Sequence, residues 1–173
     1  PEKGIEDMIR AFEGWNIKDT QLVIIGNGDA EYITFIKNLI HELNLDDIII
    51  MKSAIPFEDI PTYFQVFNIS ILLSHTTPIW KEQFGRVLVE SMAAETPVIG
   101  SDSGAIPLVI GDTGYIVPEQ NIQDIKKSLI QAFENNTTYK RLSHLAQKRA
   151  KDEFSYQAIA KKTYNFIQQV LKK

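Results

Sequence analysis

The sequence contains no cysteine, and its only histidines are His41, His75 and His144, scattered among 173 residues. A chain without cysteine forms no disulfide and no thiolate metal site, and three separated histidines argue against a histidine-based metal centre. No run of about 18 apolar residues is present, so the sequence predicts no membrane-spanning helix, and no secretory signal opens it. The length suits one domain with one core, and we expect this domain to be cytoplasmic.

Basic residues are scarce in most of the chain and concentrate near its end. Residues 1–139 contain 9 lysines and arginines against 20 acidic residues, whereas residues 140–173 contain 9 against 2. A solvated helix face is the usual reason for such a cluster, and peripheral contact with an anionic membrane is the alternative. We expect no nucleic acid as a partner.

Short apolar runs alternate with helical patterns along most of the chain. The apolar runs are 21–26, 47–51, 68–73, 96–100 and 114–117. The helical segments are 4–13, 30–43, 57–66, 85–94 and 121–134. Continuous apolar runs of this length are typical of parallel strands covered on both faces by helices. The sequence therefore predicts an α/β fold, a doubly wound, Rossmann-like parallel sheet with extra helices at its C-terminal end.

The last 35 residues are predicted to be helical, with one apolar stripe. The stripe consists of side chains at spacings of three and four: Tyr156, Ile159, Ala160, Thr163, Ile167, Val170 and Leu171. A stripe of this kind covers an apolar surface. We expect that surface to be the domain's own sheet or a partner domain.

The opening of the chain leads directly into a helix without a preceding strand. Residues 1–4, Pro-Glu-Lys-Gly, are followed at once by the helical pattern. A doubly wound fold normally begins with a strand, and that strand lies in the middle of the sheet. We therefore expect a first strand upstream of Pro1, between the strands at 21–26 and 69–74.

The segment 81–94 contains the clearest indication of a ligand site. A strand ends near Ser74, a polar loop follows, and a helix begins near Gly85. The free N–H groups and the dipole of a helix N-terminus favour phosphate, and glycine allows the backbone to approach it closely. The turns 26–29 and 101–107 each follow a strand as well, so all three are expected at the carboxyl edge of the sheet.

Two charged residues near this edge have open interpretations. Glu90 lies among apolar residues of a helix, so its carboxylate needs a partner, and a ribose diol or an arginine or lysine of the fold would serve equally. Lys3 could pair with a phosphate, although an isolated lysine more often faces solvent. The turn Gly26-Asn27-Gly28 is a poor dinucleotide fingerprint, because the third glycine would fall on Glu31, and a plain tight turn explains it equally well.

The order of short motifs along the chain resembles that of the family 4 glycosyltransferases, which have the GT-B fold. Glu82 and Glu90 stand in the E-x7-E spacing of that family, within E-x-F-G-x4-E-x-M-A-A. Glu2-Lys3-Gly4 is similar to the family's EKG, and Gly26-x-Gly28 to its second turn. The later motifs are S-x2-G-x-I-P at 101–107, G-x2-G-x2-V-P at 111–118 and F-S-Y at 154–156.

The resemblance implies a role for each matching residue. Glu82 would lie by the donor sugar and its diphosphate, at the reacting centre, and Glu90 would hold the ribose. Lys3 would neutralise the diphosphate, and Gly26 and Gly28 would form a turn at the donor. The distal phosphate would bind the backbone of Phe84, Gly85, Arg86 and Val87, and the base would lie against Ser53, Ala54 and Ile55.

The resemblance also implies the chemistry of the whole enzyme. Members of the family transfer a sugar from a nucleotide diphosphate with retention of anomeric configuration, without a metal or other cofactor. The leaving diphosphate is stabilised electrostatically by cationic side chains and helix amides. The donor would be a UDP-, GDP- or ADP-sugar, and the pathway polysaccharide or glycolipid biosynthesis.

Residues 1–173 would then be the single donor-binding domain of a two-domain enzyme. The acceptor-binding N-terminal domain and the first strand, with the family's phosphate-binding arginine, would lie outside this sequence, and 1–173 alone would be inactive. In the loop after Ser101, Ala105 and Leu108 stand where the family has glycine and glutamate, so the role of that loop is less well defined.

Other functions remain open on sequence grounds. A non-catalytic nucleotide-binding module, or a GT-B epimerase or phosphorylase, would share this architecture. A receiver domain would need an aspartate at the end of its third strand, and the segment Ile50–Ser53 has none. An NAD-dependent dehydrogenase is disfavoured by Glu31. The combination of EKG with E-x7-E favours the transferase.

Overall fold

A computed structural model describes residues 1–172 and contains five short parallel strands and a series of helices. The strands are β1 (Leu22–Ile25), β2 (Ile49–Lys52), β3 (Ser70–Leu72), β4 (Val98–Ser101) and β5 (Tyr115–Val117). The helices are α1 (Ile5–Ala11), α2 (Ala30–Glu42), the 3-10 helix η1 (Phe57–Asp59), α3 (Ile60–Val66), α4 (Arg86–Ala93), α5 (Ile106–Ile110), α6 (Ile122–Glu134), α7 (Asn136–Arg149), the π-helix η2 (Ala150–Phe154) and α8 (Tyr156–Leu171). The alternation of strands and helices confirms the predicted α/β fold.

The strands form two hydrogen-bonded groups within residues 1–172. β1 pairs with β2 in parallel, with Leu22 opposite Ile49. β3, β4 and β5 form the second group, also parallel, with β4 in the middle. β1 and β3 do not pair with each other. The space expected between the strands at 21–26 and 69–74 is therefore present.

Local sequence explains where several helices begin. The side chain of Asp29 accepts hydrogen bonds from the backbone N–H groups of Glu31 and Tyr32, both at 3.0 Å, and so caps α2. Asn121 and Asn135 cap α6 and α7 in the same way, by accepting from Asp124 N and Thr138 N. Such caps satisfy N–H groups that have no partner inside the helix, which fixes the start of each helix.

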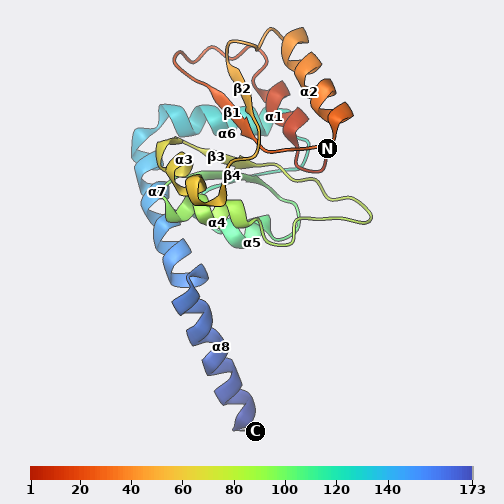
Figure 1. Ribbon diagram of the computed structural model, residues 1–173. Helices are drawn as coiled ribbons and strands as arrows, with labels where there is room; N and C mark the ends of the chain where they lie inside the picture. Colours follow the sequence, from red (N-terminus) through yellow and green to blue (C-terminus); the bar gives the residue numbers. More distant parts are fainter. Residues whose placement is uncertain (173) are drawn as a thin grey trace.

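Two hydrophobic cores hold the helices against the strands. The first includes Ile9 of α1, Ile36 of α2 and Leu129 of α6, packed around β1 and β2 and reaching Ile99 of β4. The second joins α4 and α5 to the end of α7, with Leu88, Met92, Ile110 and Ala146 as members. In Figure 1, α1 and α2 lie to the right of β1 and β2, while α4 and α5 lie below β3 and β4.

One helix was not expected from the sequence. Residues 106–110, which the motif indicated only as part of a ligand-side turn, form α5, with Pro107 in its first turn. Arg149 donates to the carbonyl oxygens of Val109 (2.8 Å) and Leu108 (2.7 Å). A short helix leaves its last carbonyl groups without partners inside the helix, so this distant arginine completes the C-terminal end of α5.

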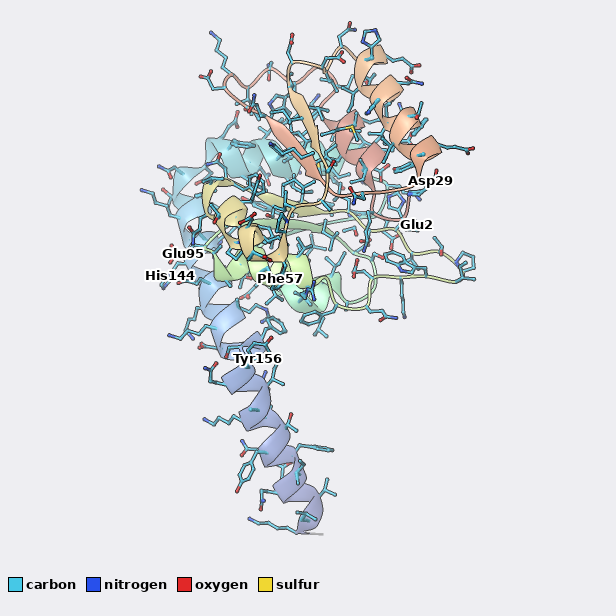
Figure 2. All side chains as sticks on the ribbon, in the orientation of Figure 1. Glu2, Asp29, Phe57, Glu95, His144 and Tyr156 are labelled. Carbon is cyan, nitrogen blue, oxygen red and sulfur yellow. The ribbon has the colours of Figure 1, made fainter. Side chains whose placement is uncertain are left out.

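The C-terminal helix leaves the body of the domain. Figure 1 shows α8 pointing away from all other elements, and Figure 2 shows its side chains, from Tyr156 onward, surrounded by open space. None of the residues of α8 is buried. The apolar stripe predicted for residues 156–171 therefore exists on a helix, but no described residue covers it. No helix within residues 1–172 is both long and apolar enough to cross a membrane.

Candidate functional site

The loops that follow the strands meet at one edge of the molecule. The side-chain oxygen of Asn27, after β1, accepts from the backbone N–H of Ala54, after β2, at 3.1 Å. The guanidinium carbon of Arg86, at the start of α4, lies 5.8 Å from the ring centroid of Phe57, in η1. The turn 26–29, the loop 53–55 and the helix start at 85–87 therefore share this edge, as was predicted for the first and the last of them. Phe57 is labelled in Figure 2.

Glu82 is the centre of a junction between three segments. Its Oε2 accepts from Lys3 Nζ at 2.7 Å and from Ser74 Oγ at 2.9 Å. Its Oε1 accepts from the backbone N–H of Gly85, at 3.2 Å, directly before α4. The side chain is 12% exposed, whereas Lys3 is 53% exposed. The structure thus places Lys3 and Glu82, which are 79 residues apart, in direct contact.

The charge state of Glu82 follows from these contacts. Partial burial acts to raise the pKa of Glu82, but the hydrogen bonds from Lys3 and Ser74, with the charge of Lys3 and the Gly85 N–H, outweigh it and hold the pKa below its usual value. Glu82 is therefore a carboxylate at neutral pH. The Lys3 ammonium also lies 4.7 Å from the ring centroid of Trp80, within the range of a cation–π contact.

The backbone of Glu82 is fixed by the loop after β4. Its carbonyl oxygen accepts from the N–H of Ala105 at 2.9 Å. Gly104 has φ of +55°, and a Cβ at that position would lie 2.1 Å from the same carbonyl oxygen. Only glycine fits both the left-handed backbone and this close approach. The loop containing Gly104 and Ala105 therefore holds the backbone of Glu82 in position.

Glu90 has a partner inside the fold. Its Oε1 lies 3.1 Å from Arg86 Nε, one turn earlier on α4, and its side chain is 27% exposed. The apolar neighbours of Glu90 in the sequence predict a substantially buried carboxylate; α4 instead leaves Glu90 partly exposed, on the face where Arg86 reaches solvent. The arginine partner considered from the sequence is thus present, and Glu90 does not contact the Glu82 junction.

A second polar cluster, not identified from the sequence, links three strand ends. The carboxylate of Glu119, after β5, accepts from the backbone N–H and the Oγ1 of Thr76, both at 2.6 Å. Thr76 Oγ1 also lies 2.9 Å from Ser103 Oγ, and Asp102 Oδ1 accepts from Glu119 N at 2.8 Å. Partial burial acts to raise the pKa of Glu119, but the hydrogen bonds from Thr76 and Ser103 lower it overall. This cluster holds the start of the loop that contains Glu82.

The missed residues share one sequence signal, which is a polar side chain shortly after a buried strand. Ser74, Thr76, Ser103 and Glu119 all meet this condition, but so do many turn residues without a role. Of the remaining predicted residues, Phe84 is 40% exposed and packs its ring edge-on against Phe154. Within residues 1–172, no three histidine, aspartate or glutamate side chains are grouped so that they could hold a metal ion.

Sequence comparisons identify relatives over most of the chain. The model of a family described as "Glycosyl transferases group 1" matches residues 1–149. The chain is 26% identical over 173 residues to N-acetyl-alpha-D-glucosaminyl L-malate synthase of Bacillus anthracis, in a match that covers 98% of this chain and 43% of that relative. It is 26% identical over 165 residues to the capsular polysaccharide biosynthesis glycosyltransferase CapM of Staphylococcus aureus, covering 91% and 40%. The chain therefore spans less than half of the length of these relatives.

Two solved structures illustrate proteins with the same fold. Sucrose-phosphate synthase from Thermosynechococcus elongatus matches with a TM-score of 0.83 and 26% identity, over 99% of this chain and 43% of that one. HepE from Anabaena, solved in complex with UDP, matches with a TM-score of 0.86 and 19% identity, over 98% and 46%. The arrangement of strands and helices in this chain is therefore one that known proteins adopt.

Proposed function

This chain belongs to the group 1 glycosyl transferases, and on that premise we propose that its carboxyl edge binds the diphosphate of a nucleotide-sugar donor. The observation that carries the proposal is the junction at Glu82, where Lys3 and the N–H of Gly85, directly before α4, meet one carboxylate. An ammonium and a helix N-terminus are the groups that bind phosphate in many folds. Here they converge at the edge where open α/β sheets hold their ligands.

The residues of the junction suggest how a diphosphate would bind. The N–H groups of Arg86 and Val87 lie in the first turn of α4, where they have no partner within the helix. Together with Lys3 they would meet the negative charge that develops on the leaving diphosphate, which is an electrostatic form of catalysis. We propose that this charge is met without a metal ion and that the sugar is transferred with retention.

Glu82 and a phosphate would compete for the same donors. In the structure, the carboxylate of Glu82 takes both the Lys3 ammonium and the Gly85 N–H. A phosphate that arrived with the donor would attract the same two groups more strongly, because it carries more charge and more acceptor oxygens. Glu82 would then turn towards the sugar, where a carboxylate can accept hydrogen bonds from hydroxyl groups.

Glu90 and the loop 53–55 are proposed to hold the nucleoside. Glu90 is partly exposed on α4, whereas Glu82 lies in the loop before that helix, and the partner of Glu90, Arg86, is mostly exposed. A side chain with a solvent-exposed partner can exchange that partner for a ribose diol at low cost. The base would lie against Ser53, Ala54 and Ile55, which Asn27 holds in place.

The acceptor and the complete reaction belong to the whole protein. The relatives are more than twice as long as this chain, and we propose that a further, N-terminal domain supplies the acceptor site. Positioning donor and acceptor together provides much of the rate of such reactions, so the donor half alone would transfer little. We also propose that the protein is located in the cytoplasm, where nucleotide sugars would be available to bind at the carboxyl edge of the strands.

Isothermal titration calorimetry with UDP, GDP, ADP and NAD would test the proposal directly. UDP is the first nucleotide to examine, since the HepE structure contains it. We expect a nucleoside diphosphate to bind and NAD not to bind. Lys3→Ala should weaken that binding about 10- to 100-fold, because one hydrogen bond to a charged group contributes about 1.5–3 kcal/mol. Lys81→Ala, which removes an exposed lysine beside Glu82, is the matched control and should change affinity less than twofold. Equal losses in both variants would disprove the assignment of Lys3.

A further inference from the structure

The motif F-S-Y at 154–156 joins η2 to α8. Ser155 caps α8 by accepting a hydrogen bond from Ala158 N at 3.2 Å. Tyr156 is 91% exposed, and Figure 2 shows it where α8 leaves the body of the domain. Phe154, the last residue of η2, is instead packed against the second hydrophobic core. Of these three side chains, Phe154 is therefore the one that can act on the body of the domain.

Phe154 contacts the loop that leads into α4. Its ring packs edge-on against the ring of Phe84, with the two centroids 5.6 Å apart and the ring planes at 78°. The elements α4 and η2 contact each other as well. An edge-to-face aromatic pair has a preferred geometry and stabilises a contact beyond the apolar area that it buries. The pair is therefore a directional link between the C-terminal segment and the carboxyl edge of the strands.

The position of Phe154 is itself fixed by neighbouring elements. The guanidinium carbon of Arg149 lies 5.7 Å from the centroid of the Phe154 ring, within the range of a cation–π contact. Arg149 is held in turn by two hydrogen bonds, at 2.8 and 2.7 Å, to carbonyl oxygens at the end of α5. The adjacent residue, Glu153, forms an ion pair with Lys162 of α8. Phe154 is thus tied to both α5 and α8.

Phe84 has less support of its own. It is 40% exposed, and it is followed by Gly85, which has φ of +77°. Because glycine adopts left-handed and right-handed conformations about equally readily, the residues of this turn do not determine its direction by themselves. A side chain that is held directly before the glycine restricts the turn. The ring of Phe154 provides such a support for Phe84.

The turn at Phe84 and Gly85 directs the N–H groups of the proposed donor site. The N–H of Gly85 donates to Glu82 Oε1 at 3.2 Å. The N–H groups of Arg86 and Val87 follow in the first turn of α4 and have no partner within the helix. A hydrogen bond weakens steeply as its angle departs from a straight line. A change in the direction of this turn would therefore weaken all three N–H groups as phosphate donors.

We propose that Phe154 is a positioning residue of the donor site. Through the ring of Phe84 it holds the turn before α4, so that the N–H groups at the start of α4 point towards the diphosphate of the donor. This role rests on the proposed function, which supplies the diphosphate. π-helical turns occur frequently at functional sites, and η2 is a π-helical turn that ends at Phe154.

Four variants test this role. Phe154→Leu removes the ring and keeps an apolar side chain. Tyr156→Leu makes the same kind of change at an exposed position of the same motif and is the matched control. Phe84→Leu, alone and combined with Phe154→Leu, shows whether Phe154 acts through Phe84. Circular dichroism and urea unfolding establish that each variant is folded under the conditions of the measurements.

Two quantities are measured, UDP affinity by calorimetry and the hydrogen exchange rate of the Gly85 amide by NMR. The Tyr32 amide is the internal reference, because it too donates to a carboxylate at the start of a helix. We expect Phe154→Leu to weaken UDP binding about 2- to 10-fold, the range that corresponds to one edge-to-face aromatic pair. The same variant should accelerate exchange at Gly85 relative to Tyr32. Tyr156→Leu should change both quantities by less than about 1.5-fold.

The combined variant distinguishes positioning from a general structural role. If Phe154 acts through Phe84, then Phe154→Leu should have no further effect on UDP affinity once Phe84→Leu is present. Equal losses of affinity with and without Phe84→Leu would overturn the proposal, and so would equal losses in Phe154→Leu and Tyr156→Leu. Phe84 is 40% exposed, so Phe84→Leu should fold even where Phe154→Leu does not. Unchanged exchange at Gly85 in Phe84→Leu would also overturn the proposal.

The exchange measurement separates this role from the proposed function. Faster exchange at Gly85 in Phe154→Leu and in Phe84→Leu, in a protein that binds no nucleoside diphosphate, would support the link between the two rings and contradict the donor site. UDP binding that is equally tight in wild type and in Phe154→Leu would support the donor site and contradict the role of Phe154.

Discussion

Replacement of Glu82 by glutamine tests the junction that the proposed function depends on. The carboxylate accepts from Lys3, Ser74 and Gly85 through two oxygens. A glutamine side chain has one oxygen and one NH₂ group, so in either orientation the NH₂ group faces a donor. In the better orientation the oxygen keeps Lys3 and Ser74, and the Gly85 N–H is left without an acceptor.

The size of the effect follows from this count. Leaving one partly buried donor unsatisfied costs about 1–3 kcal/mol, so we expect Glu82→Gln to lower the free energy of unfolding by about 2 kcal/mol at pH 7. For a chain of this length that corresponds to a Tm about 4–8 °C lower. The ion pair with Lys3 adds little, at most about 1 kcal/mol, because Lys3 is 53% exposed.

The pH dependence provides the sharper test. The folded pKa of Glu82 lies below the usual value of 4.5, so its contribution to stability is fully present above the unfolded pKa. That contribution is lost as the pH falls below about 4.5 and through the folded pKa. The stability difference between wild type and Glu82→Gln should therefore narrow towards acidic pH.

Urea unfolding at a series of pH values from 7 to below 4 measures both effects. Glu42→Gln, which changes an exposed glutamate at the end of α2, is the control and should stay within about 0.5 kcal/mol of wild type. A Glu82 variant as stable as wild type at pH 7 would refute the reasoning. A difference that persists undiminished at acidic pH would show that the shape of the side chain matters and its charge does not.

Three further expectations follow from the structure. Glu90→Gln should weaken nucleoside diphosphate binding by about 1–3 kcal/mol in calorimetry. An unchanged affinity would show that Glu90 only pairs with Arg86 and does not contact the nucleotide. Gly104→Ala should lower the free energy of unfolding by more than about 1 kcal/mol, since its Cβ would meet the Glu82 carbonyl at 2.1 Å; an unchanged Tm would mean that this loop moves freely. The 173-residue chain should show no sugar transfer to an acceptor in a donor-consumption assay, and turnover at the rate of an ordinary enzyme would contradict the need for a second domain.

The order of the strands along the chain and the edge at which their loops meet could be predicted because they depend on local patterns. The segment 21–26 is apolar and β-branched, and its turn follows at Gly26, so both the strand and its carboxyl end can be read from the sequence. The same holds for the helix start at Gly85. Each of these features is determined within a few residues, and the fold then brings them to one edge.

Contacts between distant residues could not be predicted in this way. The hydrogen bond between Glu119 and Thr76 depends on how far each loop extends after its strand. The spacing of residue types in the sequence does not show that distance. The helix α5 was missed because Ile106–Ile110 is too short to show a period, and its end is completed by Arg149, about 40 residues later. The exposure of Glu90 likewise depends on the direction in which Arg86 extends.

The free position of α8 has a consequence for the helix itself. Without buried residues, α8 gains little stability from packing, and an isolated helix of about this length is marginal in water. Its cap at Ser155, which accepts from Ala158 N at 3.2 Å, anchors only the first turn. In solution α8 should therefore exist in a helix–coil equilibrium. Any surface that covers its apolar stripe would shift this equilibrium, so the mean helicity measured by circular dichroism would report when α8 meets its partner.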